Sequence, residues 1–261
     1  MSNASREFSE LYELAFSWDS SIESGWLDLA LATLNPPRPL RIIDVGAGTG
    51  RFALTLASRS STYEAVEPDP AMRKILKRTL ERTFEPGSNP EIHCNIADIK
   101  ESAEFTLFVF MTDVLSYIYP AKEFDVLFES MQPHINGKGA VIIDIALWND
   151  DELYRSEEWD SPTPDGQIHA RCEAKRSPYN LNERTETIQF SLKDVNGSKI
   201  ARQQNLLHAF SANKIIETFK SRKLDYVCAV SSSGVHINDI KEFEKRAIIC
   251  FKAEGVIPLS L

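Results

Sequence analysis

The sequence has no apolar run close to the ~20 residues that span a bilayer, and its start lacks the basic and apolar segments of a secretion signal. The four cysteines are scattered and form no CxxC pair, which argues against a disulfide framework and against a zinc site. Basic residues are outnumbered 29 to 38, for a formal net charge of −9, whereas nucleic-acid binding usually needs a basic face. We therefore expect a cytoplasmic protein that uses no metal and binds neither membrane nor nucleic acid.

The middle of the chain alternates short apolar runs with amphipathic segments, as βαβ units do. Strands are expected at 40–45, 63–66, 91–97, 105–111 and 140–147. Helices are expected at about 51–57, around 72–80 and at 121–131. This order predicts an α/β fold with a Rossmann-like, mostly parallel sheet and helices on both faces.

The pattern differs at both ends of this region. Residues 5–34 predict an amphipathic helical segment, broken around Trp18 to Gly25 and ended by the prolines after Asn35. Residues 148–166 are acidic and predict a loop. Three strands without intervening helices follow, at 167–174, 187–192 and 200–210, with Asn196-Gly197 indicating a hairpin between the last two. A helix capped by Ser211 and strands at 224–230 and 247–252 complete the chain.

These changes of pattern predict one domain with an insertion. The expected parts are an N-terminal helical cap (1–36), a Rossmann-like core (37–149), an antiparallel insertion (150–206) and the remainder of the core (207–261).

The most informative stretch is Asp44-Val45-Gly46-Ala47-Gly48-Thr49-Gly50, between a predicted buried strand and a helix start. Glycines let a ligand approach the backbone closely, and a helix start offers unpaired N–H groups. Glu67 ends the next strand, where its carboxylate can accept the two hydroxyls of a ribose. These residues predict a nucleotide-type cofactor site.

The spacing G-x-G-x-G, with an acidic residue two positions before it, differs from the G-x-G-x-x-G of dinucleotide dehydrogenases. It resembles motif I of class I S-adenosylmethionine-dependent methyltransferases. Residues 95–99 and 105–118 also resemble later motifs of that class, and 131–144 resembles its fifth-strand segment, although MQPHINGKGA replaces the usual L-x-P-G-G. The position of the insertion looks most like N-methyltransferases of aminosugars and of glycine, whose lid strands cover the substrate. The resemblance therefore implies a substrate lid at 150–206 and a cofactor-binding core at 37–149.

The resemblance implies S-adenosylmethionine as cofactor and S-adenosylhomocysteine as product. The three glycines would line the methionine part, Asp44 would anchor the amino-acid end and Glu67 the ribose. Asp98 would bind the adenine amine, with Pro68 and Ile99 on either side of the ring. The whole implied cofactor set is Asp44, Gly46, Ala47, Gly48, Gly50, Glu67, Pro68, Ala97, Asp98, Ile99 and Met111.

Methyl transfer from a sulfonium needs alignment above all, and a base only where the nucleophile arrives protonated. The resemblance points to Tyr117, just past the fourth strand, with Asp113 four residues earlier. Tyr12 would close over the cofactor. The residues expected to line the acceptor pocket are Trp148, Tyr154, His169, Arg171 and His208.

We therefore predict a methyltransferase that acts on a small molecule, with an amine nitrogen of natural-product or aminosugar type as the first choice of acceptor. An O-methyltransferase of the same fold is an alternative, as is a protein that binds S-adenosylmethionine without catalysis. Glycine spacing disfavours an NAD-dependent oxidoreductase. A monomer or a homodimer is expected.

Overall fold

The computed structural model describes residues 9, 12, 21–85, 90–118, 122–135, 137–147, 157–162, 168–174, 185–194, 196–208, 210–231, 233–237 and 246–254. Most of the description of 157–206 concerns the backbone. No helix in these ranges has the length and apolar character needed to cross a membrane.

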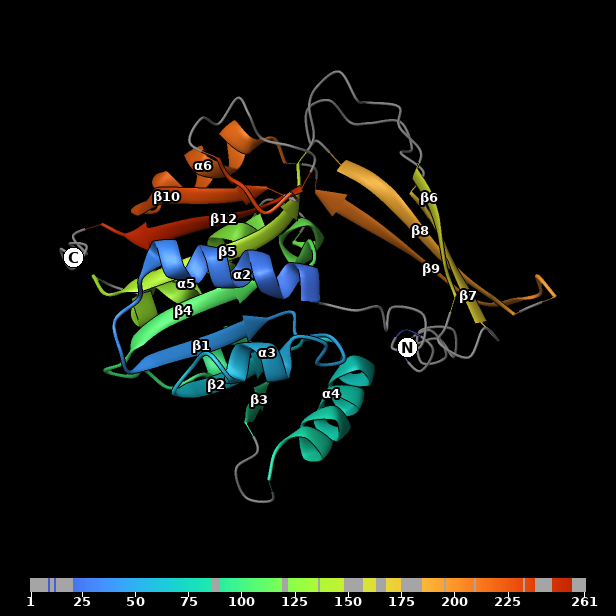
Figure 1. Ribbon diagram of the computed structural model, residues 1–261, viewed down its shortest axis with the longest axis horizontal. Coiled ribbons are helices and arrows are strands. Elements are labelled where there is room, and N and C mark those ends of the chain that lie inside the picture. The colour runs from blue at the N-terminus through green and yellow to red at the C-terminus, as the bar shows by residue number, and fades with distance from the viewer. Residues whose placement is uncertain are drawn as a thin grey trace.

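An eight-stranded sheet forms the core, in the order β11-β10-β12-β5-β4-β1-β2-β3 (Figure 1). Its strands are β1 (Leu40–Val45), β2 (Thr62–Val66), β3 (Glu91–His93), β4 (Phe105–Phe110), β5 (Gly139–Ala146), β10 (Leu224–Ser231), β11 (His236–Ile237) and β12 (Arg246–Ala253). The first five are parallel to one another, whereas β12 pairs antiparallel with β5, and β10 and β11 continue antiparallel. The predicted Rossmann-like fold is confirmed.

Helices cover both faces of this sheet. The helices are α2 (Ser21–Leu34), α3 (Ala53–Ala57), α4 (Pro70–Thr83), α5 (Lys122–Ile135) and α6 (Ala212–Lys220). Successive buried strand residues belong to different clusters: Ile42 lies with side chains of α2, α3 and α4, whereas Ile43 lies with those of α5 and α6. Alternation on a strand thus supplies two apolar cores, one on each face.

A second, antiparallel sheet follows β5 in the chain. It contains β6 (Glu157–Pro162), β7 (Ile168–Ala174), β8 (Thr185–Asp194) and β9 (Lys199–His208), paired in that order. Gly197, at φ +80°, lies in the turn between β8 and β9, as the Asn-Gly pair predicts. Figure 1 shows this sheet beyond the carboxyl ends of β1, β4 and β5.

Several boundaries differ from expectation. The strand expected at 91–97 ends at His93, because Asp98 accepts hydrogen bonds from the Cys94 thiol and the Asn95 N–H and closes a 3-10 turn, η1 (Ile96–Asp98). The loop expected at 148–166 contains β6, whose pairing with β7 outweighs its acidic composition.

The break expected around Trp18 to Gly25 is wrong for residues 21–25, which belong to α2. Leu27, Ala30 and Leu34 are buried on one side of that helix, and their packing outweighs the cost of a glycine in its first half. Helix α5 runs past the expected end at Met131 as far as Ile135.

Candidate functional site

A cavity lies at the carboxyl ends of β1, β2 and β4, where the strand order reverses and α/β folds commonly bind ligands. Its volume is about 270 Å³, close to the lower end of small-molecule sites. The lining residues are Ser9, Tyr12, Asp44, Gly46, Ala47, Gly48, Thr49, Arg51, Phe52, Glu67, Pro68, Asp69, Met72, Met111, Thr112, Val114 and Tyr117.

The glycine turn after β1 bends back onto β2. The N–H groups of Gly46 and Ala47 donate to the carbonyl of Val66, at 2.8 and 3.1 Å. Gly46 has φ +71°, and a Cβ at this position would lie 2.4 Å from a methyl carbon of Val114. A side chain is therefore excluded both by backbone conformation and by space.

Glu67, which follows β2, lies next to the glycine turn. Its carboxylate accepts the N–H of Gly48 and the N–H of Asp69, each at 2.8 Å, one on each oxygen. Burial raises the pKa of Glu67, although the two backbone donors act to lower it. The carboxylate is thus held in one orientation and still has lone pairs for a ligand.

Asp44 is buried at the end of β1 and accepts the hydroxyl of Tyr63 at 2.9 Å. Burial raises the pKa of Asp44 to about 7; the bond from Tyr63 opposes the shift and the charge of Glu67 adds to it. A cationic ligand group beside Asp44 would favour its ionised form.

Asp69 is the N-cap residue of α4, and Pro70 takes the first helical position. The side chain of Asp69 accepts hydrogen bonds from the N–H groups of Ala71 and Met72. Arg73, one turn into the helix, donates to the carbonyls of Glu67 and Pro68. The loop at residues 67–69, after β2, is therefore held by hydrogen bonds from the backbone and from a side chain of α4.

Other predicted cofactor residues do not line the cavity. Asp98 is fully exposed and bonds within its own turn. Ala97 and Ile99 flank it, and Gly50 faces Leu76 of α4 instead. The adenine contacts assigned to this segment stay predictions.

Of the three predicted catalytic residues, Tyr12 and Tyr117 line the cavity. Tyr117 ends a 3-10 turn, η2 (Val114–Tyr117), and is 45% exposed. Asp113 precedes this turn and does not line the cavity; its Oδ1 accepts the Ser116 hydroxyl at 2.7 Å and the Ala146 N–H at 3.2 Å.

Of the predicted acceptor residues, His208 alone has a described side chain, and it does not line the cavity. Trp148 and Tyr154 lie outside the described residues. His169 and Arg171 lie on β7, where only the backbone is described. The ring of His208 packs against Phe124 and Phe210, with centroids 5.9 and 4.4 Å away.

Sequence reasoning did not single out eight lining residues: Ser9, Thr49, Arg51, Phe52, Asp69, Met72, Thr112 and Val114. The Asp69-Pro70 pair carries a helix-start signal that could have placed Asp69 and Met72. Arg51 donates to Glu23 at 3.0 Å, a contact that no local pattern indicates.

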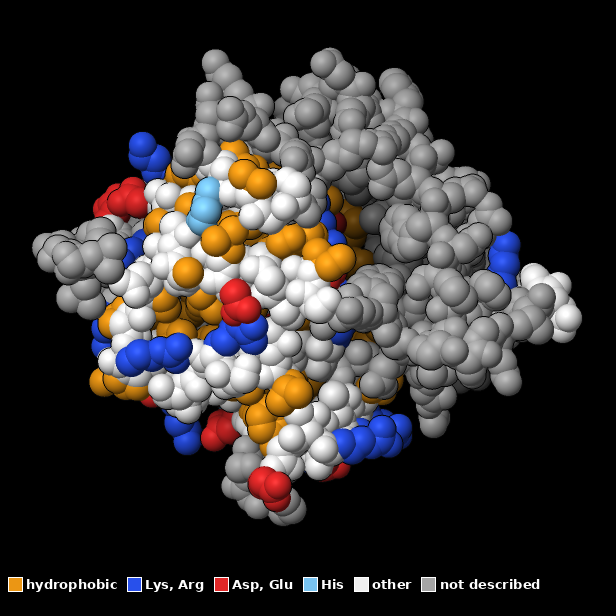
Figure 2. Space-filling view, in the orientation of Figure 1, with side chains coloured by type: hydrophobic (Ala, Val, Ile, Leu, Met, Phe, Trp, Pro, Cys, Tyr) orange, Lys and Arg blue, Asp and Glu red, His pale blue; other side chains and the backbone are white. Residues whose placement is uncertain are grey.

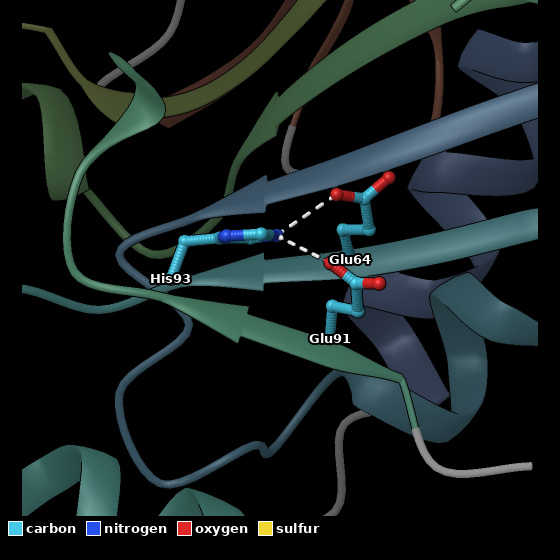
Figure 3. A group of neighbouring side chains, drawn as sticks. All are labelled: Glu64, Glu91 and His93. Atoms are coloured by element: carbon cyan, nitrogen blue, oxygen red, sulfur yellow. Dashed lines mark hydrogen bonds and ion pairs between the residues drawn. The ribbon is translucent and has the colours of Figure 1, made fainter. Parts of the chain in front are cut away.

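Within the described residues, Glu64, Glu91 and His93 form a group close enough to hold a metal ion (Figure 3). It lies on β2 and β3, outside the lining of the cavity. Arg41 already binds one oxygen of Glu64 at 2.6 Å, and His93 binds the other at 2.9 Å. The group thus has an explanation in ion pairing and hydrogen bonding without a metal.

Solved structures of similar fold include an S-adenosylmethionine-dependent methyltransferase from Clostridium acetobutylicum, with 17% identity, a TM-score of 0.71 and coverage of 97% of this chain and 100% of that one. An amino pentose methyltransferase from Micromonospora echinaspora, involved in calicheamicin biosynthesis and solved with its cofactor bound, has 16% identity, a TM-score of 0.68 and coverage of 93% and 97%. A sugar N-methyltransferase from a Streptoalloteichus species has 16% identity, a TM-score of 0.66 and coverage of 94% and 92%.

Such identities show a shared fold and no more. No curated protein sequence matches the chain. A family model described as a methyltransferase domain, however, matches residues 20–192, well over half of the sequence. The chain therefore belongs to the methyltransferase-domain family, with the fold of S-adenosylmethionine-dependent methyltransferases.

Proposed function

We propose that the cavity binds S-adenosylmethionine and that the enzyme transfers its methyl group to a small-molecule acceptor, with an amine nitrogen as first choice. The observation that carries this proposal is the carboxylate of Glu67, held between the N–H groups of Gly48 and Asp69 beside the glycine turn. That arrangement suits the two hydroxyls of a ribose.

The residues present fit this cofactor. Three acidic residues, Asp44, Glu67 and Asp69, line the cavity together with Arg51. S-adenosylmethionine carries an ammonium, a sulfonium and a carboxylate, so its charges complement this set. A Cβ on Gly48 would find its nearest neighbour 4.0 Å away, so the turn leaves open space for a ligand.

Each side chain then has a role. Glu67 accepts the ribose hydroxyls, Asp44 binds the ammonium, and Arg51 binds the carboxylate of the methionine part. Pro68 and Met72 line the same cavity beyond Glu67 and offer apolar surface to the adenine ring.

Bound S-adenosylmethionine supplies an activated methyl group, and the chain supplies alignment, which can contribute up to roughly 7–11 kcal/mol in favourable models. Tyr117 and Tyr12 border the cavity, where Tyr117 would orient the nucleophile and Tyr12 would close over the cofactor. A phenol ordinarily has a pKa near 10 and is a poor base at neutral pH, so orientation is the role we assign to Tyr117.

The antiparallel sheet β6-β7-β8-β9 would serve as a lid over the acceptor. Its last strand, β9, lies against η2, the turn that carries Tyr117. Deleting residues 150–206 should abolish turnover and leave cofactor affinity within about tenfold, or 1.4 kcal/mol. A folded truncated protein that binds no cofactor would contradict this division.

Partners and location are proposed on weaker grounds. Among the described residues of the face shown in Figure 2, Lys and Arg side chains lie in separate small groups, which favours a small-molecule acceptor over a nucleic acid. A cytoplasmic location and a monomeric or homodimeric state stay predictions, as does catalysis without a metal.

The test is a methyl-transfer screen of amines, aminosugars, peptides and hydroxylated metabolites, with mass-spectrometric detection of products. We expect a gain of one methyl group on an amine, together with S-adenosylhomocysteine. Methylation of a hydroxyl alone would establish the O-methyltransferase alternative. Tight cofactor binding without turnover of any acceptor class would favour the non-catalytic one.

A further inference from the structure

Next to the cavity, four charged side chains from distant parts of the chain are linked by ion pairs, with acidic and basic residues in alternation. Arg246, the first residue of β12, donates two hydrogen bonds to the carboxylate of Asp144 on β5, at 2.8 and 2.6 Å. The Oε1 atom of Glu23, on α2, lies 3.7 Å from Nη2 of Arg246 and 3.0 Å from Nη2 of Arg51. Of the four, only Arg51 lines the cavity.

Asp144 holds the backbone that follows β4. Its Oδ2 accepts the N–H of Thr112 at 2.9 Å, and its carbonyl accepts the N–H of Asp113 at 2.9 Å. Thr112 and Asp113 have φ angles of +54° and +62°, two consecutive non-glycine residues in the left-handed region. Each costs on the order of 1–2 kcal/mol, so the surrounding contacts must impose this conformation.

This turn adjoins two parts of the proposed site, the segment that carries Tyr117 and the glycine turn. Thr112 lines the cavity, and Val114 and Tyr117 follow on η2 and line it too. Val114 also lies against Gly46 of the glycine turn. A shift of the Thr112–Asp113 turn would therefore displace the wall of the cavity and the tyrosine together.

Arg246 allows Asp144 to hold this turn as a carboxylate. Asp144 is completely buried, and an ion in that position is strongly unfavourable unless it is paired. The guanidinium of Arg246 also lies over the ring of Trp26 on α2, 5.3 Å from the ring centroid, and this contact helps to hold Arg246 in place.

We propose that Arg246 is a positioning residue for methyl transfer. Through its two bonds to Asp144 it holds Thr112 and Asp113 in the left-handed conformation, and so places Tyr117 beside the reacting groups. The proposal rests on the proposed methyltransferase activity for its kinetic consequence and on the geometry alone for its structural one.

The chain contains a matched control. Arg41 and Glu64 form another arginine–carboxylate pair of the same sheet, away from the cavity, with the second oxygen of Glu64 bound by His93 (Figure 3). Arg41 is more deeply buried than Arg246, so Arg41→Met should lower thermal stability at least as much as Arg246→Met. It should not move the cavity wall.

The test compares Arg246→Met, Arg246→Lys and Arg41→Met for kcat, for KM of each substrate and for amide hydrogen exchange of the peptide 111–117. We expect Arg246→Met to lower kcat by about 30- to 100-fold, the scale of a misplacement near 1 Å, with a smaller rise, up to about tenfold, in KM for the cofactor, whose cavity Thr112 and Val114 also line. Arg246→Lys keeps one charged bond to Asp144 and should recover part of kcat. Exchange at 111–117 should rise in Arg246→Met and stay unchanged in Arg41→Met.

The double variant Arg246→Met with Asp144→Leu guards against simple misfolding. It removes both charges of the pair, so its stability should approach that of the wild type, whereas kcat should stay low because Thr112 has lost its acceptor. Full kcat in this variant or in Arg246→Met, or an equal loss in Arg41→Met, would overturn the proposal. Hydrogen exchange at 111–117 does not depend on turnover, so it tests the structural role of Arg246 by itself. Absence of methyltransferase activity in the wild-type protein would refute the proposed function and leave that structural test intact.

Discussion

Opposite ends of the main sheet each carry an arginine–carboxylate pair, and the two pairs have different surroundings. Toward the start of β1, Arg41 binds Glu64 of the neighbouring strand and the carbonyl of Lys100, and these bonds join β1 to β2 and to the loop before β4. At the carboxyl end, Arg246 binds Asp144, which restrains a strained turn beside the cavity. The same ion-pair chemistry thus serves the scaffold in one place and the site in the other.

The difference teaches that burial and charge alone do not identify a functional residue. Glu64 and Glu67 are both buried and lie three residues apart. Only Glu67 lines the cavity, because it follows the end of β2, where the chain turns away from the sheet. Position at the carboxyl edge decides the role.

Two glycines test this contrast with the largest expected effect. Gly46 and Gly137 have φ values of +71° and +69°, but a Cβ would clash with Val114 at Gly46 and meet nothing within 4 Å at Gly137. Calorimetry should show that Gly46→Ala lowers cofactor affinity by more than about a hundredfold, or ~2.8 kcal/mol. Gly137→Ala should cost on the order of 1 kcal/mol of unfolding free energy and leave the affinity unchanged. Equal cofactor affinities in the two variants would refute the contrast.

Two glutamates of one chain segment give the next effect. Glu67→Ala should weaken cofactor binding by about 1.5–3 kcal/mol, the usual scale for hydrogen bonds to a charged group. Glu64→Gln should lower the melting temperature, because Arg41 loses its buried partner, and should leave the dissociation constant within about twofold. The prediction fails if Glu64→Gln weakens cofactor binding as much as Glu67→Ala does.

Tyr117→Phe removes one hydroxyl and keeps the ring. For an amine acceptor we expect kcat to fall about ten- to a hundredfold with unchanged cofactor affinity, since the hydroxyl orients the nucleophile. For a hydroxyl acceptor the loss should approach the upper end of ~10²–10⁴. Steady-state kinetics on an identified acceptor measures this. Unchanged kcat and KM would reduce Tyr117 to a packing residue.

The pH dependence of cofactor binding should be the smallest effect. The pKa of Asp44 is raised to about 7, so the ionised form that binds an ammonium grows as pH rises. Calorimetry should show about a tenfold gain in affinity from pH 6 to pH 8, which Asp44→Asn abolishes and Glu64→Gln retains. The folded state binds more protons through Asp44 than the unfolded state between pH ~4 and ~7, so this group lowers stability as pH rises through that range. Affinity independent of pH in the wild type would contradict the assignment.

Much of the fold was predictable, because β1 and the segments that follow it show local signals. The apolar run before Gly46 predicts β1 with its observed bounds, and Asn196-Gly197 predicts the hairpin of the second sheet. Strand β6 was not predictable from its own residues, since its pairing partner β7 decides its structure.

The site divides in the same way. Asp44, Gly46 and Glu67 follow from motif spacing, and all three line the cavity. The bond between Arg246 and Asp144 joins residues far apart in the sequence and follows from strand pairing, which no local pattern contains. Asp98 shows the opposite case, because a motif predicts its role while its side chain caps its own turn.

The most direct test of the central claim is calorimetric titration of the wild-type protein with S-adenosylmethionine, S-adenosylhomocysteine and NAD, without added metal. We predict binding of both sulfur-containing nucleosides at one site per chain and none of NAD. Tight binding of NAD, with no heat from either of the other two, would contradict the account.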